Sequence, residues 1–193
     1  VILNMFLLAY GGTVAVAAFS VGQYVDSIVS MIIFGLCSAL TPALSYCYGA
    51  GLKKRVWDLE KFILRLSSGL SLFTLLFLFF GGRLLIPVFV KDGDVELAAM
   101  SARLIRVFSL SYAVGWIAQS LSAFLTAVEK AGRSLVLSLA DSCVLPMLAL
   151  FTLAPLYGLQ GIWWTAFVSG VCSAVLALLL AQRILRSFSR SRV

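Results

Sequence analysis

The sequence predicts an all-α, polytopic membrane protein, and three observations lead to this fold class. Hydrophobic residues make up 62% of the 193 residues and charged residues only 12%. The mean hydropathy is +1.05, whereas soluble domains average about 45–50% apolar and about 25% charged residues. The charges gather at the ends of long apolar runs, which is where membrane helices carry them. We therefore expect residues 1–193 to form a single transmembrane lobe, a six-helix bundle.

Six apolar runs follow one another along the chain, and each helix must cover a hydrocarbon core of about 30 Å. The first run reaches only Tyr10 before the Gly11-Gly12 pair. At about 1.5 Å per residue it covers about half of the core, so we interpret it as an incomplete helix of a chain truncated at its N-terminus. The expected spans are 1–10 (incomplete), 14–46, 62–80, 95–128, 135–156 and 162–184.

The basic residues are distributed unequally between the two sides of the predicted membrane. If the loop after Tyr48 lies inside the cell, eleven basic residues fall inside and four fall outside. Cytoplasmic loops of membrane proteins carry an excess of Lys and Arg. The C-terminus is therefore expected in the cytoplasm of a cell whose plasma or inner membrane holds this multi-pass chain. The four outside residues are Arg83, Lys91, Arg103 and Arg106.

Composition excludes several classes of function. The net charge of +7 comes from residues at helix ends and not from a basic, aromatic face that would bind nucleic acid. The chain has no histidine, and its four cysteines have no CxxC spacing. The commonest general base is therefore missing, and the cysteines lack the spacing of a zinc site and are interpreted as small packing residues. We expect no enzyme activity, no catalytic residue, no metal and no cofactor. The lipid bilayer is the expected surrounding of the helices.

The second expected span carries a polar stripe along one side. Turning about 100° per residue, its Ser, Thr, Gln and Asp residues fall within roughly a third of the circumference. A polar stripe on a spanning helix faces protein or water, because exposing it to lipid is costly. Asp26 lies about twelve residues into this span, near the middle of the membrane. The stripe comprises Ser20, Gln23, Asp26, Ser27, Ser30, Cys37, Ser38, Thr41 and Ser45.

Polar faces of the spans 14–46, 95–128 and 135–156 are predicted to converge on one cavity, while the Leu- and Phe-rich span 62–80 faces lipid. An acid near the middle of a membrane normally faces a cavity or a partner, and a tryptophan ring can hold a cation over its face. Gln23, Asp26 and Gln119 could instead join helices together, and Asp141 could be an interfacial charge with a local partner. The candidate substrate- or ion-binding residues are Gln23, Asp26, Tyr112, Trp116, Gln119 and Asp141.

Several segments resemble a known family in their order and spacing. They are Asn4, GGTVAVAAFSVGQ (11–23), SALTPALSYCYGAGLKKRV (38–56), FVKDGDVELAAMSARLIRV (89–107), FLTAVEKAGRS (124–134) and PLYGLQGIWWTA (155–166). Together they resemble the second half, helices seven to twelve, of the multidrug and toxic compound extrusion (MATE) transporters.

This resemblance implies the C-terminal lobe of a secondary active multidrug or organic-cation efflux antiporter driven by H⁺ or Na⁺. Such a lobe lacks its partner, an N-terminal six-helix half. The sodium-linked branch of the family uses acids in its seventh and tenth helices. Here the remaining part of the seventh has no acid, and the tenth has only Glu96, at its outer end. The resemblance therefore leaves the coupling ion open.

Two other functions remain open from the sequence. A flippase for lipid-linked precursors belongs to the same superfamily, although its cleft would need basic residues for phosphate, and the spans here are nearly free of interior Lys and Arg. A structural membrane subunit, from another class of function, would act by assembly alone. A membrane-embedded enzyme is disfavoured because Asp26 and Asp141 are the only acids within the spans that could serve one.

Overall fold

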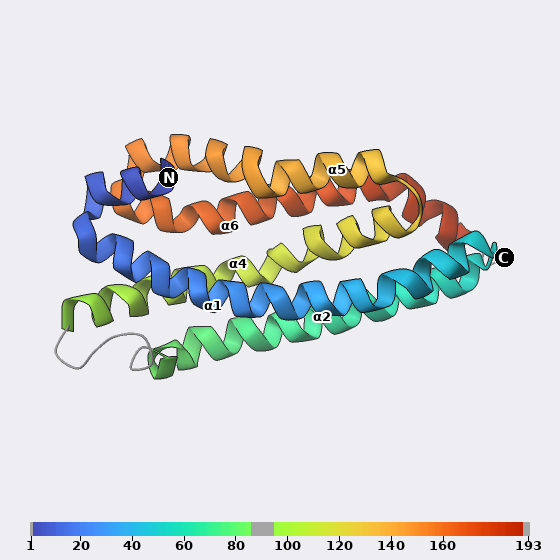
Figure 1. Ribbon diagram of the computed structural model, residues 1–193, viewed down its shortest axis with the longest axis horizontal. Helices are drawn as coiled ribbons and strands as arrows, with labels where there is room; N and C mark the ends of the chain where they lie inside the picture. The colour runs from blue at the N-terminus through green and yellow to red at the C-terminus, as the bar shows by residue number, and fades with distance from the viewer. Residues whose placement is uncertain (1, 86–94, 191–193) are drawn as a thin grey trace.

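A computed structural model describes residues 2–85 and 95–190 and consists of long helices (Figure 1). No strand occurs within those ranges, which agrees with the predicted all-α class. Residues 86–94, in the predicted connection between the third and fourth spans, lie outside the described residues. The helices are α1 (Ile2–Gly49), α2 (Lys53–Gly81), η1 (Gly82–Leu85), α4 (Val95–Ala127), α5 (Ala131–Leu139), η2 (Ala140–Val144) and α6 (Leu145–Arg190).

Helices α1 and α6 each contain one residue whose backbone is not helical. Gly12 has a φ of 65° and Gly158 a φ of 58°, and glycine adopts such positive angles without the clash that a Cβ would cause. Figure 1 shows α1 and α6 each doubling back at the same end of the molecule. The two breaks lie between the expected spans 1–10 and 14–46, and between 135–156 and 162–184.

The helices present an apolar surface that suits a membrane. Four stretches are long and apolar enough to cross one: Ile2–Gly49, Lys53–Gly81, Leu97–Ala127 and Ala131–Gln182. Large hydrophobic side chains are exposed along them, among them Met31 of α1 and Phe73 of α2. A soluble monomer rarely exposes apolar patches of such extent, whereas lipid covers them at no cost. The chain is therefore a polytopic membrane protein.

Helix α2 has two different faces. Phe62, Phe73 and Phe77 are exposed on one face, as expected for a helix next to lipid. Its other face is buried against the bundle and combines the polar Ser67, Ser71 and Thr74 with the apolar Ile63 and Leu78. The prediction that the 62–80 span simply faces lipid therefore described only half of this helix.

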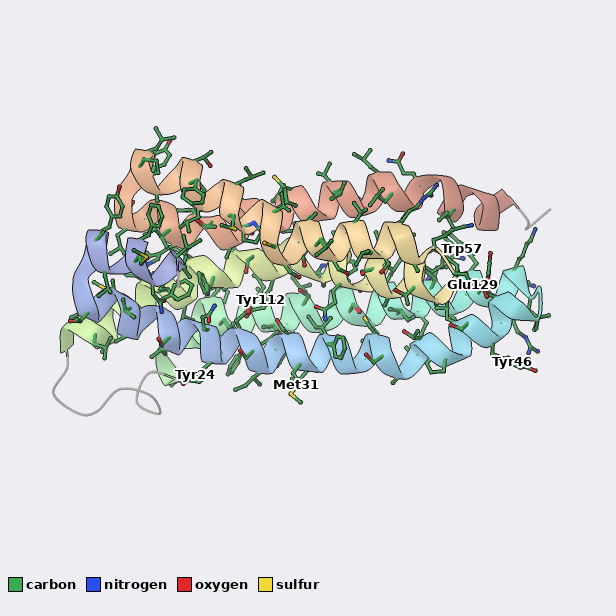
Figure 2. The ribbon with its side chains drawn as sticks, turned by 45° about the horizontal axis from the view of Figure 1, so that its top comes forward. Tyr24, Met31, Tyr46, Trp57, Tyr112 and Glu129 are labelled. Carbon is green, nitrogen blue, oxygen red and sulfur yellow. The ribbon has the colours of Figure 1, made fainter. Side chains whose placement is uncertain are left out.

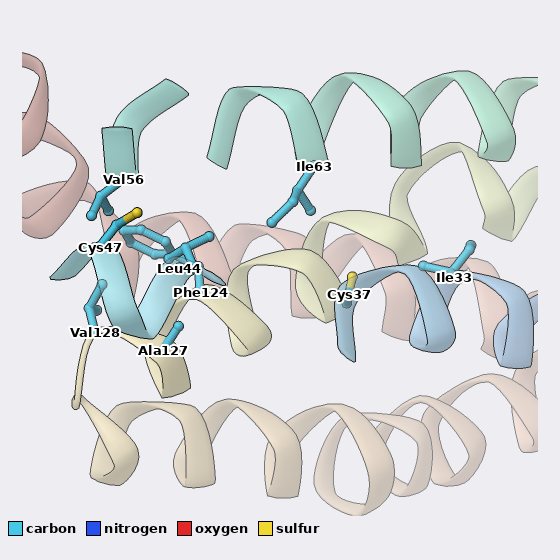
Figure 3. Close-up of a cluster of buried hydrophobic side chains, with 9 residues drawn as sticks. All are labelled: Ile33, Cys37, Leu44, Cys47, Val56, Ile63, Phe124, Ala127 and Val128. Carbon is cyan, nitrogen blue, oxygen red and sulfur yellow. The ribbon is translucent and has the colours of Figure 1, made fainter. Parts of the chain in front are cut away.

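Helix α4 is the centre of the bundle, because it packs against α1, α2 and α6. One apolar cluster closes the end at which α1 turns into α2, and it includes Cys37 and Leu44 of α1, Val56 and Ile63 of α2, and Phe124 of α4 (Figure 3). A second cluster, with members from α1, α4 and α6, closes the opposite end. Along α1, Gln23, Asp26, Ser27 and Ser30 of the polar stripe lie between the members of these two clusters, whereas Cys37 belongs to the first cluster itself.

A single π-helical turn, η2, joins α5 to α6. The backbone N–H of Leu145 donates to the carbonyl oxygen of Ala140, five residues earlier. Pro146 follows directly and has no N–H to donate. Such turns contain one more residue than an α-helical turn and are frequent at functional sites. Pro42, in contrast, lies inside α1 with no break in the helical backbone.

Candidate functional site

A cavity of about 660 Å³ opens between α1, α4 and the η2–α6 region. Its volume lies within the usual range of ligand pockets, about 300–1,000 Å³. The structure brings all six of the predicted binding residues to its lining. They are Gln23 and Asp26 from α1, Tyr112, Trp116 and Gln119 from α4, and Asp141 from η2.

Asp26 is held by a tyrosine from the neighbouring helix. The Tyr112 hydroxyl donates to Oδ1 of Asp26 over 2.7 Å, a length typical of a hydrogen bond to a carboxylate. Tyr112 is 7% exposed, and Figure 2 shows it inside the bundle, away from Tyr24 and Met31 on the outer surface. Its ring packs against Val21 and Val25 of α1 and Ile105 of α4. Packing and hydrogen bond together fix the direction in which the carboxylate points.

The lining of this cavity is acidic, amide-rich and aromatic. Asp26 and Asp141 are the only charged side chains among the described residues that line it. The indole N–H of Trp116 donates to the carbonyl oxygen of Ala113 in its own helix, over 3.2 Å. The single donor of Trp116 is thereby satisfied, so its ring can act only as an apolar or cation–π surface. These groups suit a ligand with positive charge and apolar surface.

A second cavity of about 650 Å³ extends from the first toward the end at which α1 turns into α2. The two share Gln119, Asp141 and Ser142 in their linings. Four hydroxyls on α4 and α5 form a hydrogen-bonded cluster in its wall. The bonds join Ser122 to Ser134 (3.0 Å), Ser122 to Ser138 (3.1 Å) and Thr126 to Ser134 (2.8 Å).

Helix α6 supplies part of the cavity wall that the sequence analysis did not assign to the site. Thr165, Ser169 and Gly170 all line the larger cavity. The hydroxyl of Thr165 donates to the carbonyl oxygen of Gly161 within its own helix. The spacing of four between Thr165 and Ser169 could have indicated this face, because residues four apart lie on one side of a helix.

The sequence also matches the model of a known family. The sequence model of the MatE family matches residues 1–152, which is more than half of the chain. The chain belongs to the MatE family. The MATE resemblance seen in the sequence is thereby confirmed, and the described fold and cavity are those of a MatE family member.

Curated relatives of this MatE chain are about twice as long or more. It is similar to the multidrug export protein MepA of Staphylococcus aureus strain MSSA476, with 24% identity over 180 residues. The same degree of identity relates it to MepA of Staphylococcus saprophyticus. In both comparisons the aligned part is 93% of this chain and 39% of the relative.

Solved structures with the same fold agree over nearly the whole chain. A multidrug resistance MATE family transporter of the MOP superfamily in its outward-facing conformation superposes with a TM-score of 0.88 at 15% identity. That match covers 97% of this chain and 42% of the other. An inward-facing conformation of such a transporter gives a TM-score of 0.87 and covers 99% and 44%. These similarities concern the fold, and they show that the chain spans less than half of each such transporter.

Proposed function

We propose that this chain is the C-terminal lobe of a secondary active efflux antiporter for organic cations and drugs, driven by H⁺ or Na⁺. One observation carries the proposal: the cavity has two carboxylates, two amides and a tryptophan in its lining, and no basic side chain among its described residues. Such a lining attracts positive charge and offers apolar surface for the remainder of a drug-sized molecule. The names of the curated relatives, multidrug export proteins, support the same class of substrate.

The lining argues against a phosphate-bearing substrate. Phosphate is usually bound by Arg or Lys side chains or by helix N-termini, and the carboxylates of Asp26 and Asp141 would repel it. A flippase for lipid-linked precursors is therefore the less favoured alternative.

The proposed lobe works with a second six-helix half. Gln23 is exposed and Asp26 is only half-buried, so these mid-span polar groups would face lipid unless another body covered them. Covering them is favourable because polar groups in hydrocarbon are expensive. Alternating access then follows from rocking of the two halves around a binding site near the membrane midplane. The part of the relatives that this chain does not match is long enough to contain such a half.

The proposed orientation places the turn between α1 and α2 and the C-terminus in the cytoplasm of the plasma or inner membrane. The basic residues on that side outnumber those on the other by eleven to four. With six spans, an even number, the proposed second half would join from the same side. The second cavity then opens toward the cytoplasm and the first toward the membrane midplane.

The test is efflux of ethidium from cells. Three strains would make this chain alone, the chain joined to a six-helix N-terminal half, and the joined protein with Asp26→Asn, at equal membrane levels. We expect efflux only from joined proteins. Loss of the Asp26 charge removes one charge-assisted contact of roughly 1.5–3 kcal/mol, so efflux should fall about tenfold or more.

The matched control is Asp58→Asn in the joined protein, because Asp58 is an exposed acid that pairs with Lys61 at 3.7 Å, outside the cavity. It should transport like the unaltered protein. Strong efflux from this chain alone would refute the half-transporter proposal. Undiminished efflux from Asp26→Asn would reduce Asp26 to a residue that holds helices together.

A further inference from the structure

Glu60 is a buried acid that lies away from the cavity. It stands about two turns into α2, in the charged stretch that precedes the apolar run 62–80. Although Asp58 and Lys61 beside it are accessible to solvent, the Glu60 side chain is 0% exposed. Its neighbours four residues before and three residues after it, Val56 and Ile63, share its face of the helix and belong to the apolar cluster of Figure 3. Glu60 therefore points into the junction of α1, α2 and α4.

No described residue is a hydrogen-bond partner of the Glu60 carboxyl group at that junction. Among the described residues, neither Oε1 nor Oε2 of Glu60 has a hydrogen-bond partner, and the buried hydroxyl of Ser67, two turns further along α2, also has none. Cys37 of α1 belongs to the same apolar cluster as Val56 and Ile63, and its Sγ lies 4.0 Å from the Ser120 hydroxyl of α4. Among the side chains that the structure describes, the surroundings thus offer weakly polar groups and no cation.

The titratable groups near this junction come from few elements. Helix α4 has no charged residue between Val107 and its end, and Glu129 and Lys130, which follow it, are exposed. Helix α6 packs against the cluster through Ile184, and Arg183 and Arg186 flank that residue in the sequence, with side chains outside the described residues. Other titratable groups at or beside the cluster are Cys37, Cys47 and Tyr48 of α1, and Asp58 and Lys61 of α2.

An ionised carboxylate without a donor or a cation is strongly unfavourable in such a place, whereas a neutral acid is tolerated. We infer that the Glu60 carboxyl is a proton-binding site of the packed bundle, separate from the cavity acids Asp26 and Asp141. When the junction of α1, α2 and α4 opens to water, the O–H bond breaks, its electron pair stays on the carboxylate, and the proton passes to water. Closing the junction reverses the step. The bound proton thereby stabilises the packed arrangement of these three helices.

This proton site is connected to the cavity through α2. Along the same buried face as Glu60 and Ser67, the Ser71 hydroxyl donates to the backbone carbonyl oxygen of Tyr112, the residue whose own hydroxyl holds Asp26. A displacement of α2 that admits water to Glu60 therefore also acts on the support of Asp26. The inference about Glu60 itself holds whether or not the protein exports drugs.

The first experiment is infrared spectroscopy of this chain in lipid nanodiscs at neutral pH. We expect a carbonyl-stretch band of a protonated carboxylic acid that Glu60→Gln removes and that the control Asp58→Asn leaves unchanged. Labelling glutamate with ¹³C in the unaltered chain should shift the same band, so the assignment holds even if a variant folds poorly. Of the other two glutamates, Glu129 is exposed, and Glu96→Gln serves as the control for the third. A band unchanged by both Glu60→Gln and labelling would overturn the inference.

Thermal unfolding at different pH values gives the second test. Glutamine imitates the neutral acid, so the melting temperatures of the unaltered chain and Glu60→Gln should agree near pH 4. Free glutamate titrates at about 4.3, and above that value the folded chain retains a proton that the unfolded chain has lost. The unaltered chain should therefore lose stability relative to Glu60→Gln as the pH rises. Parallel melting curves at all pH values would contradict the proposal.

An arginine partner is the competing explanation, and it has its own outcome. If Arg183 or Arg186 holds Glu60 as a carboxylate, the protonated-acid band should be absent in the unaltered chain and appear in Arg183→Gln or Arg186→Gln. That result would replace the proton site with an ion pair. A band of equal intensity in all three chains supports the proton site.

Discussion

The hydrogen bond from Tyr112 to Asp26 should couple α4 to α1 by about 1 kcal/mol. Tyr112→Phe removes only the hydroxyl, and Asp26→Ala removes only the acceptor, so the double variant loses the pair cleanly. Hydrogen bonds to charged groups contribute about 1.5–3 kcal/mol in soluble proteins, whereas polar pairs in membrane proteins average about 0.6 and reach about 1.7. Asp26 is half-buried and faces a cavity, where water can replace the lost donor. The lower range therefore applies.

The assay is a double-mutant cycle on the free energy of unfolding, measured for the chain in bicelles by denaturation at constant pH. Tyr112→Phe and Asp26→Ala should each destabilise the chain, and the double variant should be less destabilised than the sum by about 1 kcal/mol. Tyr46→Phe serves as the control partner because Tyr46 is 74% exposed on the outer surface (Figure 2). It should show no coupling to Asp26→Ala.

Additive effects of Tyr112→Phe and Asp26→Ala, within about 0.3 kcal/mol, would refute this reasoning. The 2.7 Å contact would then contribute nothing to joining the two helices, and the orientation of the Asp26 carboxylate would need another cause. Coupling well above about 2 kcal/mol, beyond the range of polar pairs in membrane proteins, would instead mean that water does not reach the pair from the cavity.

Two further predictions concern helix contact and orientation. Gly22→Ala should destabilise the chain by about 1–3 kcal/mol, because the added methyl group would overlap Cδ2 of buried Leu104 in α4. Gly35→Ala is the control, since its new Cβ would have no atom within 4 Å, and it should stabilise the chain by about 0.5–1 kcal/mol. Both changes are measured as free energies of unfolding in the same bicelles. A fluorescent protein fused to the C-terminus should be fluorescent in cells, while alkaline phosphatase fused there should be inactive; the reverse pair of results would place the C-terminus outside.

The six candidate residues could be predicted from the sequence to line a cavity. The order of polar and apolar residues along a helix determines which of its faces turns away from lipid. Gln23 and Asp26 share a face with other polar residues, and that face has no favourable neighbour except protein or water. The pairing of Asp26 with Tyr112 was beyond such reasoning. This pairing depends on how far α1 and α4 are shifted along each other. Because such a shift leaves the pattern of polar and apolar residues in each helix unchanged, the pattern cannot predict it.

Burial within charged stretches was also beyond the sequence. Lys53, Asp58 and Lys61 mark the start of α2 as solvated, and Glu60 belongs to the same stretch. Only the packing of α1 and α4 against one side of α2 shows that this acid turns inward. The buried face with Ser67 and Ser71 was missed for a related reason, since the many Leu and Phe residues around them conceal a narrow polar side.

The π-helical turn Ala140–Val144 makes the geometry of the second cavity depend on the length of the chain as well as on its residues. Deleting one residue from this turn would restore an ordinary α-helix and rotate α5 by about 100° relative to α6. Ser134 and Ser138 would then turn away from Ser122, and the hydrogen bonds that join them would break. Deleting Val144, which is in the lining of neither cavity, would thus remodel a cavity wall whose side chains are all still present. Homologues that keep this wall should tolerate substitutions in the turn more readily than changes in its length.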